Sequence, residues 1–240
     1  MRAACRAAAE VLQAVAALAE PGRTTGELND AAGELIAARG GKSPFLGYKG
    51  YPGQICVSVN EEVVHGIPGK RKLQYGDIVC LDVGIVLNGY VGDNATTVAV
   101  GLVQPRTQEL LLVTQRALFA GIAQARPGRR VGDISHAVQT TVEAHGFSVV
   151  REFVGHGVGR KMHEDPQIPN FGRPKDGPKL KPGMTLAIEP MINAGSHEVQ
   201  VLSDGWTVVS ADGAPSAHFE HTVLVTEAEA EILTWLKKTP

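Results

Sequence analysis

The first twenty residues place apolar side chains at helical spacing. Val11, Leu12, Val15 and Leu18 fall on one side, which predicts an amphipathic helix over residues 1–20. Glu10 interrupts the apolar part and no clear cleavage pattern precedes Pro21, so a signal peptide is a poor fit. We therefore expect this segment to pack within the folded protein.

The pattern that follows this helix occurs twice. The string PGRTTGELNDAA from Pro21 returns as PGRRVGDISHAV from Pro127, 106 positions later. Both copies carry apolar residues at helical spacing, and the first has the Thr24 to Glu27 spacing of a capping box. Each copy is predicted to form a helix.

A second repeat is rich in β-forming residues and ends in an acid. LQYGDIVCLD matches LKPGMTLAIE, 107 positions later, which places Asp82 over Glu189. Each half then offers another acid-bearing strand, GDNATTVAV with Asp93 and FEHTVLV with Glu220. The sequence thus pairs Asp93 with Glu220, although an insertion lengthens the second spacing.

These repeats indicate an internal duplication. We expect halves of roughly 1–103 and 104–230, packed as a single domain over residues 1–240 with approximate two-fold symmetry. The period is too long for stacked repeats. An α+β architecture, with helices on one face of a mainly antiparallel sheet, would bury such halves. The four acids would then meet near the symmetry axis.

One hairpin can be predicted in register. Asn88-Gly89 is a strong signal for a two-residue turn, so Gly84 should lie opposite Asp93. Asp82 and Asp93 then share one face as diagonal neighbours, about 7 Å apart at Cα. That distance allows two carboxylates to hold one or two ions between them.

The four acids admit several interpretations. A solvated sheet face is as plausible as a metal site for Asp82 and Asp93 taken alone. Acid–base catalysis of sugar hydrolysis needs only two carboxylates. A two-metal phosphoesterase should supply basic residues for phosphate, and only Arg160 and Lys161 lie close in sequence. Four acids with one or two imidazoles best suit a pair of divalent ions that activates water.

Three histidines are candidates for that site. His156 and His163 lie in the glycine-rich string VGHGVGRKMHEDP, and His65 precedes a glycine in NEEVVHGIPG. Glycines allow the backbone to pass close to a crowded centre. The other histidines carry no functional expectation: His136 and His145 are expected on a helix surface, and His197, His218 and His221 lack an independent argument.

Bulk properties exclude some partners. The net charge is -2 and the pI is near 6.4, so the chain has no basic footprint for nucleic acid or an anionic membrane. No stretch approaches the eighteen consecutive apolar residues of a membrane span. The three cysteines are odd in number, far apart and without metal-type spacing, which fits a reducing cytoplasm.

Taken together, six strings closely resemble the type I methionine aminopeptidases. They are NEEVVHGIPG, LDVG with GDNATTV, EFVGHGVGRKMHEDP, MTLAIEPMIN, DGWTVV and AHFEHTVLVT, which occur in the family's order over nearly the whole chain. The resemblance implies the duplicated α+β "pita-bread" fold. It implies removal of the N-terminal methionine from nascent proteins and peptides by a metal-bridging hydroxide that attacks the first peptide bond.

The resemblance also assigns residues. The five metal ligands would be Asp82, Asp93, His156, Glu189 and Glu220, holding two divalent ions of Co, Mn, Fe or Zn, with Asp93 and Glu220 bridging. His65 would contact the scissile amide, His163 would stabilise the carbonyl oxygen, and Glu189 would carry the proton. The methionine pocket would consist of Phe45, Tyr48, Tyr51, Cys56, Met162 and Trp206.

Further expectations follow from the same resemblance. A monovalent cation could bind near Asn60 and Ser216, where ordinary turn hydrogen bonding is an equal alternative. Phe45 and Met162 replace residue types common in the family, which affects fine substrate preference. Expected partners are nascent polypeptide N-termini, at the ribosome or free of it, and we expect a cytoplasmic monomer that binds neither membrane nor nucleic acid directly.

Two rival readings share parts of this pattern. A prolidase would keep the metal ligands but usually carries a separate N-terminal domain. A catalytically dead binding module would be marked by lost ligands, and none is lost. The sequence leaves open the physiological metal, the number of ions required and the preferred second residue.

Overall fold

The amphipathic segments form four α-helices. The computed structural model describes residues 1–236 of the chain. The helices are α1 (Arg2–Ala16), α2 (Thr25–Ala38), α3 (Pro105–Ile122) and α4 (Val131–Glu143), with a 3₁₀ turn, η1, at Tyr48–Gly50. The first helix is shorter than the predicted 1–20, because the chain turns at residues 17–18 ahead of Pro21.

Both predicted helix starts after Pro-Gly are confirmed. Thr24 and Glu27 form a capping box on α2, in which the Thr24 side chain accepts from the Glu27 N–H and the Glu27 carboxylate accepts from the Thr24 N–H. At α4 the Asp133 carboxylate accepts a hydrogen bond from the Arg130 N–H at 2.8 Å. These contacts satisfy backbone donors that a helix leaves without intrahelical partners.

The strands between and after the helices are short, apart from one long hairpin. They are β1 (Cys56–Val59), β2 (Glu62–Val64), β3 (Ile78–Leu87), β4 (Tyr90–Ala99), β5 (Ser148–Val149), β6 (Gly155–Gly157), β7 (Glu164–Ile168), β8 (Thr185–Ile188), β9 (Met191–Asn193), β10 (Val199–Val201), β11 (Val208–Ser210), β12 (Ser216–His218), β13 (His221–Leu224) and β14 (Glu231–Ile232). All described strand pairs are antiparallel, in sheets ordered β1-β3-β4, β10-β11-β2, β12-β9-β5 and β14-β13-β8-β6-β7. The expected α+β class is confirmed.

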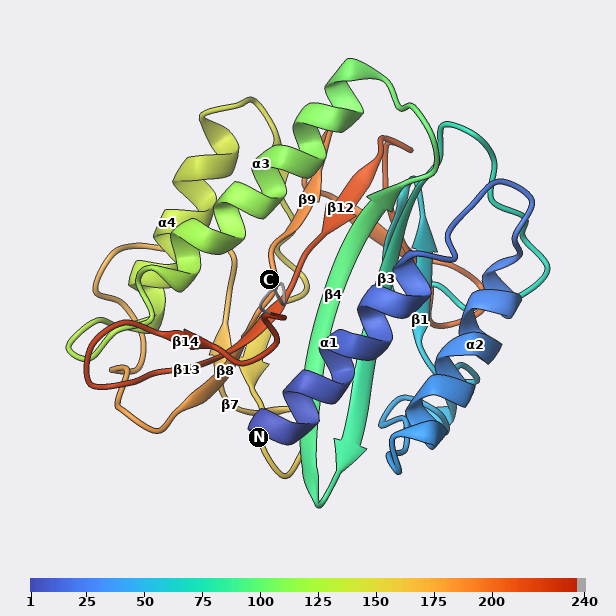
Figure 1. Cartoon of the computed structure of the whole chain (residues 1–240). Helices are drawn as coiled ribbons and strands as arrows, with labels where there is room; N and C mark the ends of the chain where they lie inside the picture. Colours follow the sequence, from blue (N-terminus) through green and yellow to red (C-terminus); the bar gives the residue numbers. More distant parts are fainter. Residues whose placement is uncertain (237–240) are drawn as a thin grey trace.

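The β3–β4 hairpin has the predicted register. Gly84 lies opposite Asp93, and Asp82 lies opposite Ala95, so the two aspartates are diagonal neighbours on one face. In Figure 1 this long hairpin runs through the middle of the molecule with α1 packed in front of it. The hairpin therefore carries two acids to the centre of the fold.

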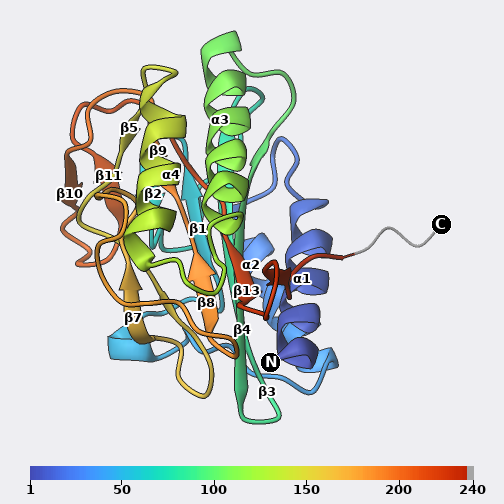
Figure 2. The same cartoon turned by 90° about the vertical axis from the view of Figure 1, so that its left-hand side faces the viewer.

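Each pair of helices covers its own hydrophobic core. Leu28 and Ile36 of α2 and Val11 of α1 pack with the strands β1 and β3 in the first core. Leu110 and Leu118 of α3 pack with α4 and with later strands in the second core, whose full membership runs from Ile78 to Val225. Figure 2 shows the two helix pairs beside the strands.

Backbone contacts recur at equivalent places in the two parts of the chain. The Leu73 N–H donates to the Arg23 carbonyl at 2.8 Å, and the Leu180 N–H donates to the Arg129 carbonyl at 2.9 Å. The lone antiparallel bridge of Thr24 with Lys72 likewise has a counterpart in Arg130 with Lys179. An internal duplication would produce this pattern, and the division into equivalent halves stays a prediction.

The strand registers change one detail of that predicted symmetry. Leu81 pairs with Thr96, and its counterpart in the repeat, Ile188, pairs with His221. Thr96 and His221 therefore correspond, and three residues earlier Asp93 corresponds to His218 rather than to Glu220. The predicted pairing of Asp93 with Glu220 was wrong, because the insertion that lengthens the second half shifts the last strand by two residues.

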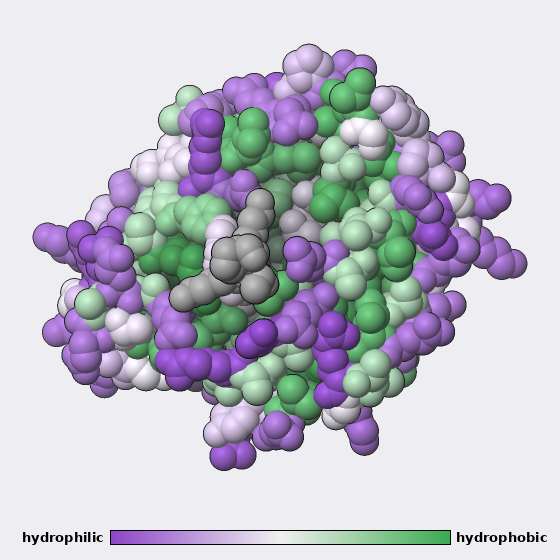
Figure 3. All heavy atoms as spheres, viewed as in Figure 1, coloured by the Kyte–Doolittle hydropathy of each residue, from purple (hydrophilic) through white to green (hydrophobic). Residues whose placement is uncertain are grey.

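The helical face is polar at its margin and apolar toward its middle, as Figure 3 shows. Between α1 and α3 lies an open groove of about 340 Å³, lined among others by Leu12, Leu118 and Trp235. Among the helices that the structure describes, none combines the length and the apolar character needed to cross a bilayer.

Candidate metal centre and substrate pocket

A cavity of about 330 Å³ opens between the two parts of the chain, and it brings the predicted site residues together. Its lining contains all thirteen of them: Phe45, Tyr48, Tyr51, Cys56, His65, Asp82, Asp93, His156, Met162, His163, Glu189, Trp206 and Glu220. These residues come from β1, β3, β4, β6, the segments beside β7, β8 and β13, and the loops between strands. Side chains up to 175 positions apart in sequence thus face one space.

Asp82 and Asp93 enter the cavity from the long hairpin. Both carboxyl groups are buried among strands rich in valine and leucine. Burial raises the pKa of Asp82 well above its usual range, and the neighbouring charge of Asp93 raises it further. Burial likewise raises the pKa of Asp93. Two carboxylates in this setting need a positive partner to stay ionised.

His156 lies at the centre of β6, between β7 and β8. The flanking glycines make this possible, because a Cβ at Gly155 would stand 2.4 Å from the Ala187 carbonyl oxygen and one at Gly157 would stand 2.2 Å from that of Asp165. The His156 Nδ1 lies 2.9 Å from the Gly157 carbonyl oxygen, so Nδ1 carries the proton and donates it. Burial lowers the pKa of His156 to about 4, so the ring is neutral. Its Nε2 atom then carries a free lone pair.

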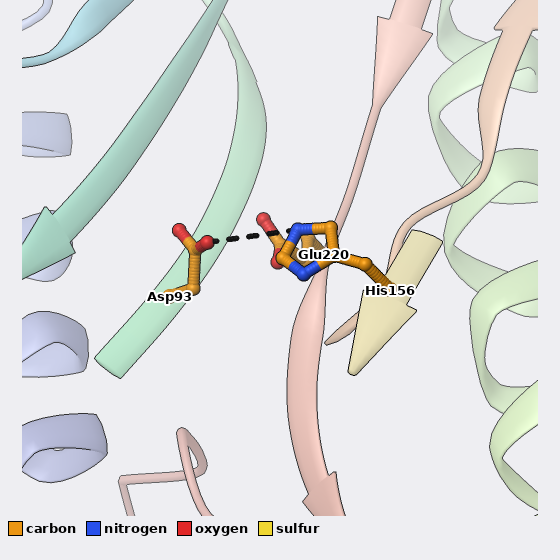
Figure 4. Close-up of side chains that lie close together, drawn as sticks. All are labelled: Asp93, His156 and Glu220. Carbon is orange, nitrogen blue, oxygen red and sulfur yellow. Dashed lines mark ion pairs between the residues drawn. The ribbon is translucent and has the colours of Figure 1, made fainter. Parts of the chain in front are cut away.

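Glu189 and Glu220 complete the acidic set. Glu189 follows β8 and Glu220 precedes β13, and burial together with the other acids raises the pKa of both. Nε2 of His156 lies 3.3 Å from Oε1 of Glu189 and 3.9 Å from Oδ2 of Asp93. One ligand atom each from Asp93, His156 and Glu220 lies within 4.8 Å of the others. Figure 4 shows these three side chains close together. This spacing is compatible with shared coordination of a cation.

The donor chemistry fits divalent metal. Oδ1 of Asp82, Oδ1 of Asp93 and Oε1 of Glu220 are buried and have no hydrogen-bond partner among the described residues. Buried polar atoms without partners are rare in folded proteins, and an ion is one of the few groups that would satisfy three carboxylate oxygens at once. Four carboxylates with one neutral imidazole suit divalent first-row metals.

His65 and His163 both line the cavity. The His65 ring packs edge to face with Phe153 at 5.4 Å and with Trp206 at 6.2 Å between centroids, and its backbone has a φ of 61°. A histidine in this left-handed region is uncommon and costs energy, as residues at functional sites often do. Burial lowers the pKa of His65 to about 4, with a smaller effect from His163.

His163 is the more accessible of the two. Its ring lies 4.5 Å from that of His156, and its Nδ1 lies 3.4 Å from the Tyr48 hydroxyl. Burial lowers the pKa of His163, and the nearby Lys49 lowers it further. Both site histidines outside the ligand set are therefore neutral near pH 7.

Five of the six residues predicted for the methionine pocket belong to one apolar cluster. Phe45, Tyr51 and Cys56 are buried, and Met162 and Trp206 pack against them. The Tyr51 and Trp206 rings meet edge to face at 5.1 Å, and the Tyr51 hydroxyl donates to the Gly66 carbonyl at 2.8 Å. Tyr48 is 36% exposed and lies at the rim of the cavity. The cluster forms an apolar wall next to the acids.

Sequence reasoning missed several lining residues. The most notable is His218, which is 1% exposed and lies 3.7 Å from Glu189. Its position two residues before Glu220 was the available signal, because alternate residues of a strand share a face. The others are Lys49, Val64, Phe153, Val154 and Met191.

The remaining histidines lie elsewhere. His145 is exposed and His136 is half-buried, both on or beside α4, so the surface expectation is met fully only by His145. His221 points to the α1–α3 groove, where its Nδ1 lies 2.8 Å from the Thr234 hydroxyl oxygen. His197 does not line the cavity.

Asn60 and Ser216, the residues predicted near a monovalent cation, are neighbours. The Ser216 N–H donates to the Asn60 carbonyl at 2.8 Å. The Asn60 side chain donates to Asp77 and accepts from the Ile78 N–H, and the Ser216 hydroxyl donates to the Ile192 carbonyl. These bonds are those of the turn alternative, and the cation site stays a prediction.

Comparison with known proteins identifies a family and several relatives. Residues 1–227 match the metallopeptidase family M24. Methionine aminopeptidase 1 of Bacillus subtilis is 56% identical over 215 residues, which cover 90% of this chain and 87% of the relative. A methionine aminopeptidase of Clostridium perfringens is 50% identical, with 99% of this chain and 95% of the relative covered.

Solved structures of other proteins have the same fold as this chain. The crystal structure of methionine aminopeptidase from Rickettsia prowazekii has a TM-score of 0.96 at 43% identity and covers 98% of this chain and 95% of its own. A prolidase from Pyrococcus furiosus has a TM-score of 0.79 at 22% identity, which shows the shared fold alone, and 63% of its length is covered. The chain therefore has the pita-bread fold and belongs to the metallopeptidase family M24.

Proposed function

We propose that this protein is a metal-dependent aminopeptidase that removes the N-terminal methionine from nascent proteins and peptides. The observation that carries the proposal is the junction of a buried acidic centre with an apolar, aromatic-walled cluster in one cavity. Relatives at 56% and 50% identity named methionine aminopeptidase support it. An acidic centre beside a pocket for one uncharged side chain suits a substrate with a free amine and an apolar first residue.

We propose that Asp82, Asp93, His156, Glu189 and Glu220 would hold two divalent ions of Co, Mn, Fe or Zn. Support comes from the unpartnered carboxylate oxygens and from the neutral Nε2 of His156. Such ions, when bound, polarise a carbonyl oxygen and lower the pKa of a water. Four negative charges would then balance two divalent cations, so the buried acids could all stay ionised.

The other polar groups would act on the peptide itself. His163, which lines the cavity, would donate to the oxygen that gains negative charge when the first carbonyl is attacked. His65, which also lines the cavity, would contact the amide nitrogen of the bond to be broken. Glu189 would accept a proton from the attacking water and pass it to the leaving amine.

The apolar cluster would bind the methionine side chain. Tyr51 and Trp206 offer ring edges and faces, which suit a polarizable thioether. Phe45 and Met162 close the pocket and would set how large a first side chain it accepts. Tyr48 lies at the rim, where it would contact the start of the peptide.

The cellular setting is a further part of the proposal. Three free, buried cysteines accord with a reducing cytoplasm. Nascent chains would be met there, at the ribosome or after release, by a protein that acts as a monomer. A monovalent cation between Asn60 and Ser216 would support the strand that carries His218 and Glu220.

A peptidase assay with metal control tests the activity. The purified protein is stripped with chelator, supplied with Mn or Co, and followed for release of free methionine from Met-Ala-Ser beside a Gly-Pro peptide. We expect methionine release that requires metal and that is lost in Glu189→Gln. His145→Gln, on the surface beside α4, serves as the matched control and should retain full activity.

The alternatives give different results. Cleavage of only the Gly-Pro peptide would indicate a prolidase. Metal binding without hydrolysis of either peptide would indicate a binding module. Absence of metal binding would refute the assignment of the acidic centre.

A further inference from the structure

His218 lies against the acidic centre although no role has been assigned to it. Its side chain is buried, lines the cavity, and has an Nε2 atom without a hydrogen-bond partner. That Nε2 lies 3.7 Å from Oε2 of Glu189. The other oxygen of the same carboxylate, Oε1, lies 3.3 Å from Nε2 of His156. Glu189 thus lies between two imidazoles, with one near each carboxylate oxygen.

Both backbone polar groups of His218 bond to one side chain, that of Thr97. The Thr97 hydroxyl donates to the His218 carbonyl at 2.7 Å, and the His218 N–H donates to the same hydroxyl at 3.0 Å. Across the approximate two-fold axis the Thr222 hydroxyl donates to the Asp93 carbonyl, also at 2.7 Å. His218 therefore occupies, in the second half, the place that Asp93 occupies in the first. A residue at that place faces the centre.

Each ring nitrogen of His218 has one polar neighbour. Nδ1 lies 3.6 Å from the Sγ atom of Cys80. Cys80 is a buried free thiol, and a thiol is a weak hydrogen-bond donor, so its S–H group can donate to Nδ1. The proton of the neutral ring then sits on Nε2, which faces a carboxylate. The opposite tautomer would point a lone pair at Glu189.

We propose that His218 is a positioning residue that holds Glu189, with its Nε2–H directed at Oε2, so that Oε1 stays turned toward His156 and the metal. The inference rests on the proposed role of Glu189 as a ligand. The present 3.7 Å must shorten by roughly 0.8 Å to give an ordinary hydrogen bond, a change that side-chain rotation can supply. Cys80 acts on Glu189 only through His218, because its thiol fixes the tautomer of the His218 ring.

Metal affinity tests this role without relying on turnover. Mn titration of the stripped protein by calorimetry is expected to show a loss of roughly 10- to 100-fold in affinity for His218→Leu, the size usual for partners that orient metal ligands. His218→Gln keeps an N–H donor and should remain within about threefold of the parent. For Met-Ala-Ser, kcat should fall in His218→Leu while KM changes little. His145→Leu, far from the cavity, is the matched control.

A double-mutant cycle separates positioning from other roles. If His218 acts through Glu189, then His218→Leu will have no further effect on Mn affinity in a Glu189→Gln background. An equal loss in both backgrounds would overturn the proposal, as would an unchanged His218→Leu or a His218→Gln as impaired as His218→Leu. Failure of Glu189→Gln alone to weaken metal binding would instead refute the ligand assignment on which the inference rests.

The tautomer gives a second measurement if His218→Leu does not fold. Nitrogen-15 spectra of histidine-labelled protein should report an Nε2–H ring for His218, assigned by its absence in His218→Gln. Cys80→Ser keeps a donor to Nδ1 and should preserve that tautomer. Cys80→Ala removes the donor and should lower the population of the Nε2–H tautomer. An Nδ1–H ring in the parent protein would refute the proposal.

Discussion

The backbone of Gly84 lies directly against the ring of Phe45. A Cβ placed at Gly84 would stand 3.0 Å from two ring carbons of Phe45 and 2.6 Å from Cγ of Pro44. Phe45 in turn forms part of the proposed methionine pocket. The close contact between hairpin and ring thus fixes one wall of that pocket.

Gly84→Ala should therefore impair methionine binding. The new methyl group must push Phe45 or Pro44 away, and we expect a several-fold higher KM for Met-Ala-Ser and a loss of about 1–3 kcal/mol in the free energy of unfolding. Steady-state kinetics and urea unfolding measure the two effects. Gly69→Ala, where a Cβ would meet no atom within 4 Å, is the control. An unchanged KM in Gly84→Ala would argue against Phe45 as a pocket wall.

Metal should stabilise the protein more at neutral than at acid pH. The pKa values of Asp82, Glu189 and Glu220 are raised by burial, so the metal-free protein binds protons that an ion must displace. At neutral pH, Mn at 100 times its dissociation constant should add about 2.7 kcal/mol. Lowering the pH favours the protonated acids and weakens this gain. Thermal unfolding with Mn or chelator at pH 7.5 and 5.5 measures the difference, and an equal gain at both pH values would contradict the assignment.

Thr234 should contribute to stability through its contacts with the start of β13. Its hydroxyl accepts the Thr222 N–H at 3.2 Å and lies 2.8 Å from Nδ1 of His221. Thr234→Val keeps the shape but leaves these buried groups without a partner, which should cost about 1–3 kcal/mol. Thr140→Val, on the exposed face of α4, should have a much smaller effect in the same urea titration. Similar values for the two variants would mean that this contact is not formed in solution.

The cysteine thiols should be unreactive in the folded protein. Burial raises the pKa of Cys5 to about 12 and also raises those of Cys56 and Cys80. An unfolded thiol ionises near pH 8.5, so above that pH the folded state holds more protons and its stability falls. Labelling with Ellman's reagent at pH 8 should detect no thiol before unfolding and three afterwards. Rapid labelling of the native protein would contradict this prediction.

Local signals made much of the fold predictable. The Asn88-Gly89 turn determined the hairpin register, and the Thr24 to Glu27 spacing located a helix start; both depend on neighbouring residues alone. The alignment of Asp93 with Glu220 failed because strand register is set by long-range pairing, which a two-residue shift alters without leaving a local trace.

The site was predictable where residues bear distinctive chemistry. The acids and the glycine-flanked His156 were recognisable in the sequence. His218 was not, because a buried histidine is more often structural, and its contact with Glu189 joins strands that lie 29 positions apart. Phe153 and Met191 were missed for a similar reason, since apolar residues that line a cavity look like core residues in a sequence.

The correspondence of Asp93 with His218 has a consequence for how ions load. Two identical subunits around a two-fold axis would present identical ligands to both metal positions. Within one continuous chain that constraint is absent, and here an anionic oxygen donor faces a neutral nitrogen ring across the axis. The two metal positions that we propose would therefore be chemically unequal. Stepwise filling, with one tight and one weaker occupancy, is the behaviour expected of such an asymmetric pair.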